Sequence, residues 1–245
     1  MMKIEILDNE DLVAQKAASI IAGEARNAAV LRGRFVIAVS GGRTPWKMIR
    51  ALTDENVPWE KIHILQVDER LAPEGHTDRN MTHLLANLQG HSPVVTRQIY
   101  AMQVEDKDPE AAAARYALTI SEVTGSSGII DLIHLGLGSD GHTASLIPGD
   151  PVLDVTGRDV ELTGFYQGRR RLTLTYPVIN RARKLLWIIT GSEKHEMLER
   201  LLDKDLSIPA GRIAQEHAMV LADKDAVAKF NGKINYVINE GKKQK

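Results

Sequence analysis

Short, continuous runs of apolar residues recur along this chain, and segments with helical periodicity separate them. A strand that is apolar at every position has both faces buried, which is typical of a parallel sheet covered by helices on both sides. Strands that alternate with helices predict βαβ units with right-handed crossovers. The sequence therefore predicts an α/β fold with a mainly parallel, doubly covered sheet, in a single domain spanning residues 1–245. The expected strands are Phe35–Val39, Ile62–Val67, Ile129–Leu135, Arg171–Thr175 and Leu185–Ile189, and the expected helices are Asp11–Leu31, Trp46–Leu52, Asn80–Leu88, Pro109–Val123 and Glu193–Leu202.

Signals at the ends of these segments add detail. Asp108 stands directly before Pro109, and a capping carboxylate followed by proline at the first helical position is typical of a helix start. At the other end of the chain, we expect Gly241–Lys245 to be a frayed basic tail without a binding role.

Charge and composition exclude several classes of site. Lys and Arg total 31 against 32 for Asp and Glu, and nucleic-acid or membrane-surface partners usually require a basic excess, so we expect neither. The chain has no cysteine, which excludes disulfides, thiolate nucleophiles and cysteine-ligated zinc. The histidines form no H-E-x-x-H motif or close pair, so we expect no metal. The N-terminal segment lacks the apolar stretch of a secretory signal, and no apolar run is long enough to span a bilayer, so we expect a cytoplasmic protein.

Polar loops follow three of the expected strands. In open α/β sheets, ligands bind beyond the carboxyl ends of the strands, where such loops converge. The loops here are Ser40–Pro45, Asp68–Arg70 and Gly136–His142. We therefore expect them to meet around one pocket.

The loop after Leu135 presents Asp140 and His142 two positions apart. An imidazole titrates near neutral pH and can move a proton, and an adjacent carboxylate can fix its tautomer or hold a substrate hydroxyl. A structural histidine is the alternative, but its place beside Asp140 in a glycine loop favours function. The loop also matches G-x-G-x-x-G, yet Pro148 and Gly149 arrive too soon for the helix that a dinucleotide site requires. We therefore expect no nucleotide cofactor.

The Ser40–Pro45 loop is a candidate anion site. Gly41 and Gly42 leave backbone N–H groups unobstructed, and a helix N-terminus favours negative charge. We expect Thr44 to cap a helix that begins at Pro45, with Arg43 able to contact a phosphate. A tight turn with an exposed arginine is an equally good interpretation of these residues alone.

Further candidates are charged. Arg70 could stabilise an oxyanion and Asp68 could accept hydrogen bonds from sugar hydroxyls, although a charged run is more often a solvated loop. Lys194 stands near an expected helix N-terminus, where a cation is unfavourable unless an anion binds there. It favours phosphate contact, with a solvated lysine as the alternative. At least one of Arg169, Arg170 and Arg171 is expected to point into the pocket.

Together these motifs resemble those of the 6-phosphogluconolactonases. The matching segments, in the family's order, are S-G-G-R-T-P at 40–45, D-E-R at 68–70, G-L-G-S-D-G-H-T-A-S-L-I-P-G at 136–149, R-L-T-L-T-Y-P-V-I-N at 171–180 and T-G-S-E-K at 190–194. The family shares a superfamily with glucosamine-6-phosphate deaminases. The resemblance implies a Rossmann-like α/β domain of sugar-phosphate isomerase type. It also implies hydrolysis of 6-phosphogluconolactone without a cofactor, in the oxidative pentose phosphate pathway.

The resemblance also implies roles for individual residues. His142 resembles the general base that activates water, Asp140 would orient it or hold the sugar, and Arg70 would stabilise the oxyanion. The partner is then a small phosphosugar lactone, bound by a monomer or small homo-oligomer. Substrate-binding positions would be Ser40, Gly41, Gly42, Arg43, Thr44, Asp68, Asn80, Arg171 and Lys194. The family often has serine and an aromatic residue around the asparagine, where this chain has Arg79 and Met81.

Two alternatives remain at this point. An amino-sugar phosphate deaminase or aldose–ketose isomerase would carry D-E-Y and an acidic residue shortly before P-G, but this chain has D-E-R and Leu146-Ile147-Pro148-Gly149. A non-catalytic sugar-phosphate sensor is disfavoured because Asp140, His142 and Arg70 are retained. Both comparisons favour lactone hydrolysis.

Overall fold

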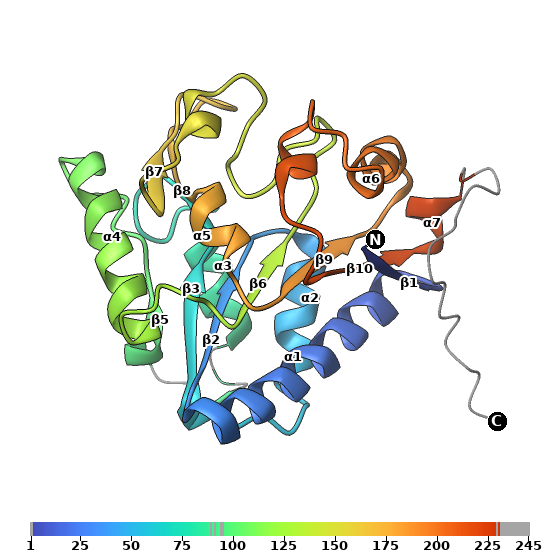
Figure 1. Ribbon diagram of the computed structural model, residues 1–245. Coiled ribbons are helices and arrows are strands. Elements are labelled where there is room, and N and C mark those ends of the chain that lie inside the picture. Colours follow the sequence, from blue (N-terminus) through green and yellow to red (C-terminus); the bar gives the residue numbers. More distant parts are fainter. Residues whose placement is uncertain (1, 89, 91, 94–95, 229, 231–245) are drawn as a thin grey trace.

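The computed structural model of the protein describes residues 2–88, 90, 92–93, 96–228 and 230. Within these residues a sheet of seven strands has the order β1-β10-β9-β6-β2-β3-β5, and every neighbouring pair is parallel (Figure 1). The expected parallel sheet is therefore confirmed. Its strands are β1 (Lys3–Leu7), β2 (Phe35–Val39), β3 (Ile62–Gln66), β5 (Ile99–Tyr100), β6 (Leu132–Leu135), β9 (Leu185–Ile189) and β10 (Ala218–Asp223).

Helices cover both faces of this sheet. Helices α1, α2 and α3 pack on one face, and α4, α5 and α6 pack on the other. Figure 1 shows α1 and α4 on opposite sides of the strands. The helices are α1 (Glu10–Arg32), α2 (Arg43–Leu52), α3 (Asn80–Leu88), α4 (Pro109–Thr124), α5 (Tyr176–Asn180), α6 (His195–Leu202) and α7 (Lys224–Val227), with 3-10 turns at Trp59–Lys61, Thr96–Gln98, Pro151–Asp154, Ser192–Lys194 and Pro209–Arg212.

Strand β2 shows why a continuous apolar strand requires a layer of helices on each face of the sheet. Phe35, Ile37 and Val39 pack into the apolar cluster of α1, α2 and α3. Val36 and Ala38, which alternate with them, pack into the cluster on the other face. Because successive side chains point to opposite faces, every position of this strand is buried.

A second, antiparallel sheet corrects part of the sequence analysis. Its three strands have the order β4-β8-β7: β4 (Asp68–Arg70) and β7 (Val160–Leu162) each pair with the central strand β8 (Arg171–Leu174). The interpretation of Arg171–Thr175 as a strand of the parallel sheet is therefore wrong, and Asp68–Arg70 is a strand rather than a loop. Strand β8 is buried at every position, although its sequence R-L-T-L alternates polar and apolar residues, as antiparallel strands commonly do.

The sequence correctly predicts the N-terminal cap of helix α4 but not that of helix α2. The Asp108 carboxylate accepts a hydrogen bond from the backbone N–H of Ala111 at 3.0 Å, as expected for the cap of α4. Helix α2 begins at Arg43 rather than Pro45, with Gly42 as its cap residue at φ 135°. The expectation that Thr44 caps this helix is wrong, because Thr44 already lies within the first turn.

The strand order places the candidate loops together. The chain passes from β2 outward to β3 and β5, then returns to β6 on the other side of β2. The order therefore reverses between β2 and β6, and such a reversal is where α/β sheets bind ligands. The Ser40 turn leaves β2 and the Gly136 turn leaves β6, so the two lie side by side. The Ser40 hydroxyl donates to the backbone carbonyl of His134 at 3.0 Å.

Two further expectations concern segments outside the sheet. Across the residues that the structure describes, no helix combines the length and apolar character needed to cross a membrane. The expected tail at Gly241–Lys245 lies outside the described residues.

Candidate active site

The turn after β6 brings Asp140 and His142 into direct contact. Oδ1 of Asp140 lies 2.5 Å from Nδ1 of His142 and also accepts the backbone N–H of His142 at 3.1 Å. A Cβ at Gly138 would lie 2.1 Å from Nδ1 of His142, so only glycine leaves room for the pair. The glycine at this position therefore serves close packing of an acid and an imidazole.

Electrostatics define which nitrogen of His142 is free. Burial raises the pKa of the Asp140 carboxyl, but hydrogen bonds from His142 and Tyr166 and the His142 charge outweigh it, and the pKa is lowered overall. A carboxylate only accepts hydrogen bonds, so Nδ1 of His142 carries the proton that lies between the two groups. In the neutral ring Nε2 then holds the lone pair. The His142 side chain is 24% exposed, so a substrate can reach it.

Asp68, which begins β4 just after the end of β3, lies close to Asn80, which begins α3. Asp68 is buried, and its Oδ2 accepts from the Ser145 hydroxyl at 2.6 Å. The Asn80 amide donates to the backbone carbonyl of Asp68 at 3.0 Å. A Cβ at Gly41 would lie 2.0 Å from Oδ1 of Asn80, so glycine there lets the Ser40 turn approach this pair. Three segments that are distant in the sequence therefore converge, as the sequence predicts.

Of the three consecutive arginines, Arg171 turns toward this cluster. Its Nη1 lies 3.4 Å from the Ser145 hydroxyl, and its Cζ lies 5.0 Å from the centre of the Tyr166 ring. Burial lowers the pKa of Arg171, Asp68 opposes that shift, and the nearby Arg70 adds to it. Arg70 itself donates to the backbone carbonyl of Asp78 at 2.6 Å. Two guanidinium groups thus lie close together beside Asp68.

The Ser40 turn also contacts the turn that follows β9. The hydroxyls of Thr44 and Thr190 lie 2.8 Å apart, and both Ser40 and Thr44 are buried. Lys194 is half-buried in the 3-10 turn just after Thr190. Arg43 is placed differently, because its side chain is 75% exposed and forms an ion pair with Glu10 at 3.2 Å.

A family model described as glucosamine-6-phosphate isomerases/6-phosphogluconolactonase matches residues 8–222. The chain belongs to this family. A protein named 6-phosphogluconolactonase from Synechocystis is 35% identical over 200 residues, covering 80% of this chain and 83% of that protein. A second protein of that name, from Nostoc, is 30% identical over 232 residues, covering 92% of this chain and 96% of that protein.

Solved structures share the fold of this family member. The 6-phosphogluconolactonase from Thermotoga maritima matches with a TM-score of 0.79 at 24% identity, over 91% of this chain and 99% of that one. A monomeric glucosamine-6-phosphate deaminase matches with a TM-score of 0.80 at 19% identity, over 93% and 99%. At these identities the likeness shows the fold alone, and members with different chemistry share it.

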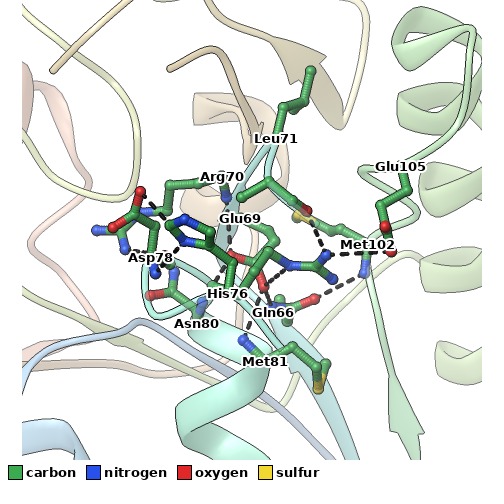
Figure 2. A network of polar contacts seen from close by, with 12 residues as sticks. Gln66, Glu69, Arg70, Leu71, His76, Asp78, Asn80, Met81, Met102 and Glu105 are labelled. Carbon is green, nitrogen blue, oxygen red and sulfur yellow. Dashed lines mark hydrogen bonds and ion pairs between the residues drawn. The ribbon is translucent and has the colours of Figure 1, made fainter. Parts of the chain in front are cut away.

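Glu69 is a residue whose role the sequence analysis missed. Its side chain is fully buried, and its carboxylate accepts the backbone N–H groups of Asn80 and Met81, each at 2.8 Å (Figure 2). The amide of Gln66 donates to it at 2.8 Å, and Nε of Arg79 lies 3.2 Å away. The carboxylate therefore caps α3 and fixes Asn80 at its start. The interpretation of this segment as a solvated loop is wrong for Glu69.

Arg79, where this chain departs from the usual family pattern, belongs to the same network. It lies directly before α3 and is buried, and its guanidinium donates to the backbone carbonyl of Ala72 at 2.8 Å. Its positive charge compensates the buried charge of Glu69, which would otherwise be costly. The departure thus has a structural explanation that requires no contact with substrate.

Ser145, Tyr166 and Thr190 were also missed. Ser145 follows the His142 turn and links Asp68 to Arg171. Its position in the G-H-T-A-S segment was the available signal. Tyr166 stands in a loop with no such signal, because its contacts depend on how a distant hairpin folds back.

Proposed function

We propose that this chain is a 6-phosphogluconolactonase, which opens the 1,5-lactone of 6-phosphogluconate with water in the oxidative pentose phosphate pathway. The observation that carries the proposal is the 2.5 Å contact between Asp140 and His142, which leaves Nε2 of His142 as a base. The relatives with 30–35% identity support the substrate, since both bear this name.

In the proposed reaction, Nε2 of His142 takes a proton from water as the water oxygen attacks the lactone carbonyl carbon. Arg70 stabilises the resulting oxyanion, because a guanidinium in a partly buried site interacts strongly with developing charge. The intermediate then collapses with cleavage of the bond to the ring oxygen, which takes the proton back from His142. The acid that forms ionises and releases a proton, and His142 returns to its starting state. Water is the only co-reactant, so the proposed reaction needs no metal or cofactor.

The phosphate group of the substrate is proposed to lie against the Ser40 turn and Lys194. Gly41 and Gly42 expose backbone N–H groups at the start of α2, a ten-residue helix whose dipole favours an anion there. Thr44 stands beside them. Contact with Arg43 requires its ion pair with Glu10 to open first.

The remaining substrate contacts are proposed for Asp68, Asn80 and Arg171. Asp68 has hydrogen-bond acceptors suited to sugar hydroxyls, and Asn80 and Arg171 offer donors beside it. We propose that the enzyme acts in the cytoplasm as one domain, a monomer or a small homo-oligomer, without a nucleic-acid partner.

The alternatives are less well supported. The deaminase or isomerase shares the fold, but the D-E-R segment and the apolar Leu146-Ile147 before Pro148 differ from that group's pattern. A non-catalytic sugar-phosphate sensor would not need the Asp140–His142 contact that this chain retains.

The test is to follow acid release from freshly generated 6-phosphogluconolactone, with unphosphorylated gluconolactone measured alongside. We expect much faster hydrolysis of the phosphorylated lactone, and a fall of about 10²- to 10⁴-fold in kcat for His142→Asn, because it lacks the base. No acceleration over spontaneous ring opening would favour the sensor. Release of ammonia from glucosamine 6-phosphate would instead favour the deaminase.

A further inference from the structure

Tyr166 contacts three of the residues to which the proposed function assigns roles. Its hydroxyl donates to Oδ2 of Asp140 at 2.9 Å. Its ring meets the His142 ring edge-on, with centroids 5.5 Å apart, and lies beneath the guanidinium of Arg171 at 5.0 Å. We propose that Tyr166 is a positioning residue, which holds the Asp140–His142 pair and Arg171 in one fixed arrangement.

The argument begins with the two oxygens of Asp140. Oδ1 receives both the ring and the backbone N–H of His142. A carboxylate held only at one oxygen can rotate about its Cβ–Cγ bond, and the imidazole that it orients would then turn with it. The Tyr166 hydroxyl occupies Oδ2 and so fixes the plane of the carboxylate. Orientation of a catalytic base by a third group is a general requirement of such sites.

The Tyr166 phenol keeps its proton at neutral pH. Burial raises its pKa above the usual value, and the hydrogen bond and charge of Asp140 raise it further. The hydroxyl is therefore a donor throughout the pH range in which an imidazole changes charge. Because this hydrogen bond partly neutralises the Asp140 carboxylate, it weakens the attraction of Asp140 for a protonated His142.

The hairpin between β7 and β8 holds Tyr166 in place. Backbone hydrogen bonds join Tyr166 and Arg169 in both directions, at 2.9 and 3.2 Å. Gln167 and Gly168 between them have φ of 51° and 79°, the two positive values of a type I′ turn. The tip of the hairpin is thus a tight, defined turn.

The three consecutive arginines hold this turn through different contacts, and Arg169 ties it to another segment of the molecule. Arg169 forms an ion pair with Asp78 at 2.6 Å, and Arg170 donates to the backbone carbonyl of Thr163 at 3.0 Å. Arg171 then stacks on the ring of Tyr166. Arg169 and the contact of Arg171 with the Ser145 hydroxyl therefore link the hairpin to other segments, whereas Arg170 and the stacking of Arg171 stabilise the hairpin itself.

The inference rests on the proposed role of His142 as the base, and Tyr166→Phe tests it while keeping the ring. Loss of one hydrogen bond to a charged group should lower kcat about tenfold, with KM changed less than about twofold. Asp140 would then attract the imidazolium form of His142 more strongly and stabilise it. The acid limb of the pH profile of kcat/KM should therefore move to higher pH.

Tyr100→Phe is the matched control. It also removes one phenol contact with a histidine, since the Tyr100 hydroxyl lies 2.9 Å from Nδ1 of His63 at the edge of the sheet. It should leave kcat and the pH profile unchanged. Tyr166→Leu removes the ring as well, so the stacking of Arg171 is lost and KM should rise.

The outcomes separate the inference from the proposed function. If the unmodified enzyme fails to hydrolyse the lactone, the proposed function is wrong. If it does, but Tyr166→Phe has the same kcat and acid limb, only the positioning role is wrong. An equal loss in Tyr100→Phe would also overturn that role.

Discussion

Gly136 and Gly138 stand two positions apart in one turn, yet a methyl group would meet very different surroundings at each. At Gly138 it would lie 2.1 Å from Nδ1 of His142 and 2.6 Å from Oδ1 of Asp140, whereas at Gly136 nothing lies within 4 Å. We expect Gly138→Ala to displace the pair and lower kcat at least about 100-fold, because a small misplacement of a catalytic group costs that much. Gly136→Ala should retain most of the activity. Equal kcat values in the two variants would show that the close packing at Gly138 is unimportant.

The same residues show what a sequence can reveal about a site. Asp140 and His142 are two positions apart, so their contact needs only a local turn, and the sequence indicates it. The partner of Asp140 on the other side, Tyr166, is 26 positions away. That contact exists only because a hairpin folds back over the His142 turn, and no spacing in the sequence encodes it. Glu69 was missed for a related reason, since its partners Asn80 and Met81 belong to the next helix.

The start of helix α3 depends on one buried carboxylate. Glu69→Gln would remove its charge and replace one acceptor with a donor, which leaves one backbone N–H group of α3 without an acceptor and the charge of Arg79 without its buried counter-ion. Breaking a buried ion pair on one side typically costs about 3–5 kcal/mol, and we expect a loss near that size in the free energy of unfolding. Glu105→Gln is the control, because Glu105 lies 3.7 Å from the same Arg79 but is 54% exposed. It should cost less than about 1 kcal/mol. Urea denaturation measures both, and equal losses would contradict the role of Glu69.

Individual elements were predictable where their signals are local. Helix α4 has a capping aspartate and a proline at its start, and β2 and β9 have the expected bounds. Strand β10 was missed because its sequence A-M-V-L-A-D contains strong helix formers, and only its place between β1 and β9 makes it a strand. Strand β8 was placed in the wrong sheet, although its sequence R-L-T-L alternates polar and apolar residues, unlike the continuous apolar runs of β2 and β9.

The sequence was sufficient to predict the type of sheet, but not the order of its strands. Continuous apolar strands and intervening helices indicate a doubly covered parallel sheet, and the two apolar clusters confirm it. The reversal between β2 and β6 is set by long-range pairing, and the sequence does not state which strands are neighbours. It is this reversal that brings the Ser40 turn beside the turn that carries His142.

The centre of the sheet also links the stability of the whole protein to pH. His134 lies on β6, is fully buried, and burial lowers its pKa from 6.5 to about 3. Below about pH 6.5 the unfolded chain binds a proton at this histidine and the folded one does not, so stability is lost as pH falls toward about 3. The loss from this group is at most about 1.4 kcal/mol per pH unit. His134→Asn keeps an acceptor for the backbone N–H of Ser40, which now donates to Nδ1 at 3.2 Å, but cannot titrate. Urea denaturation at several pH values between about 4 and 6, a range that lies between these two pKa values, should show that the free energy of unfolding depends less on pH in the variant. If both proteins lose stability at the same rate, His134 is protonated without unfolding and the linkage is wrong.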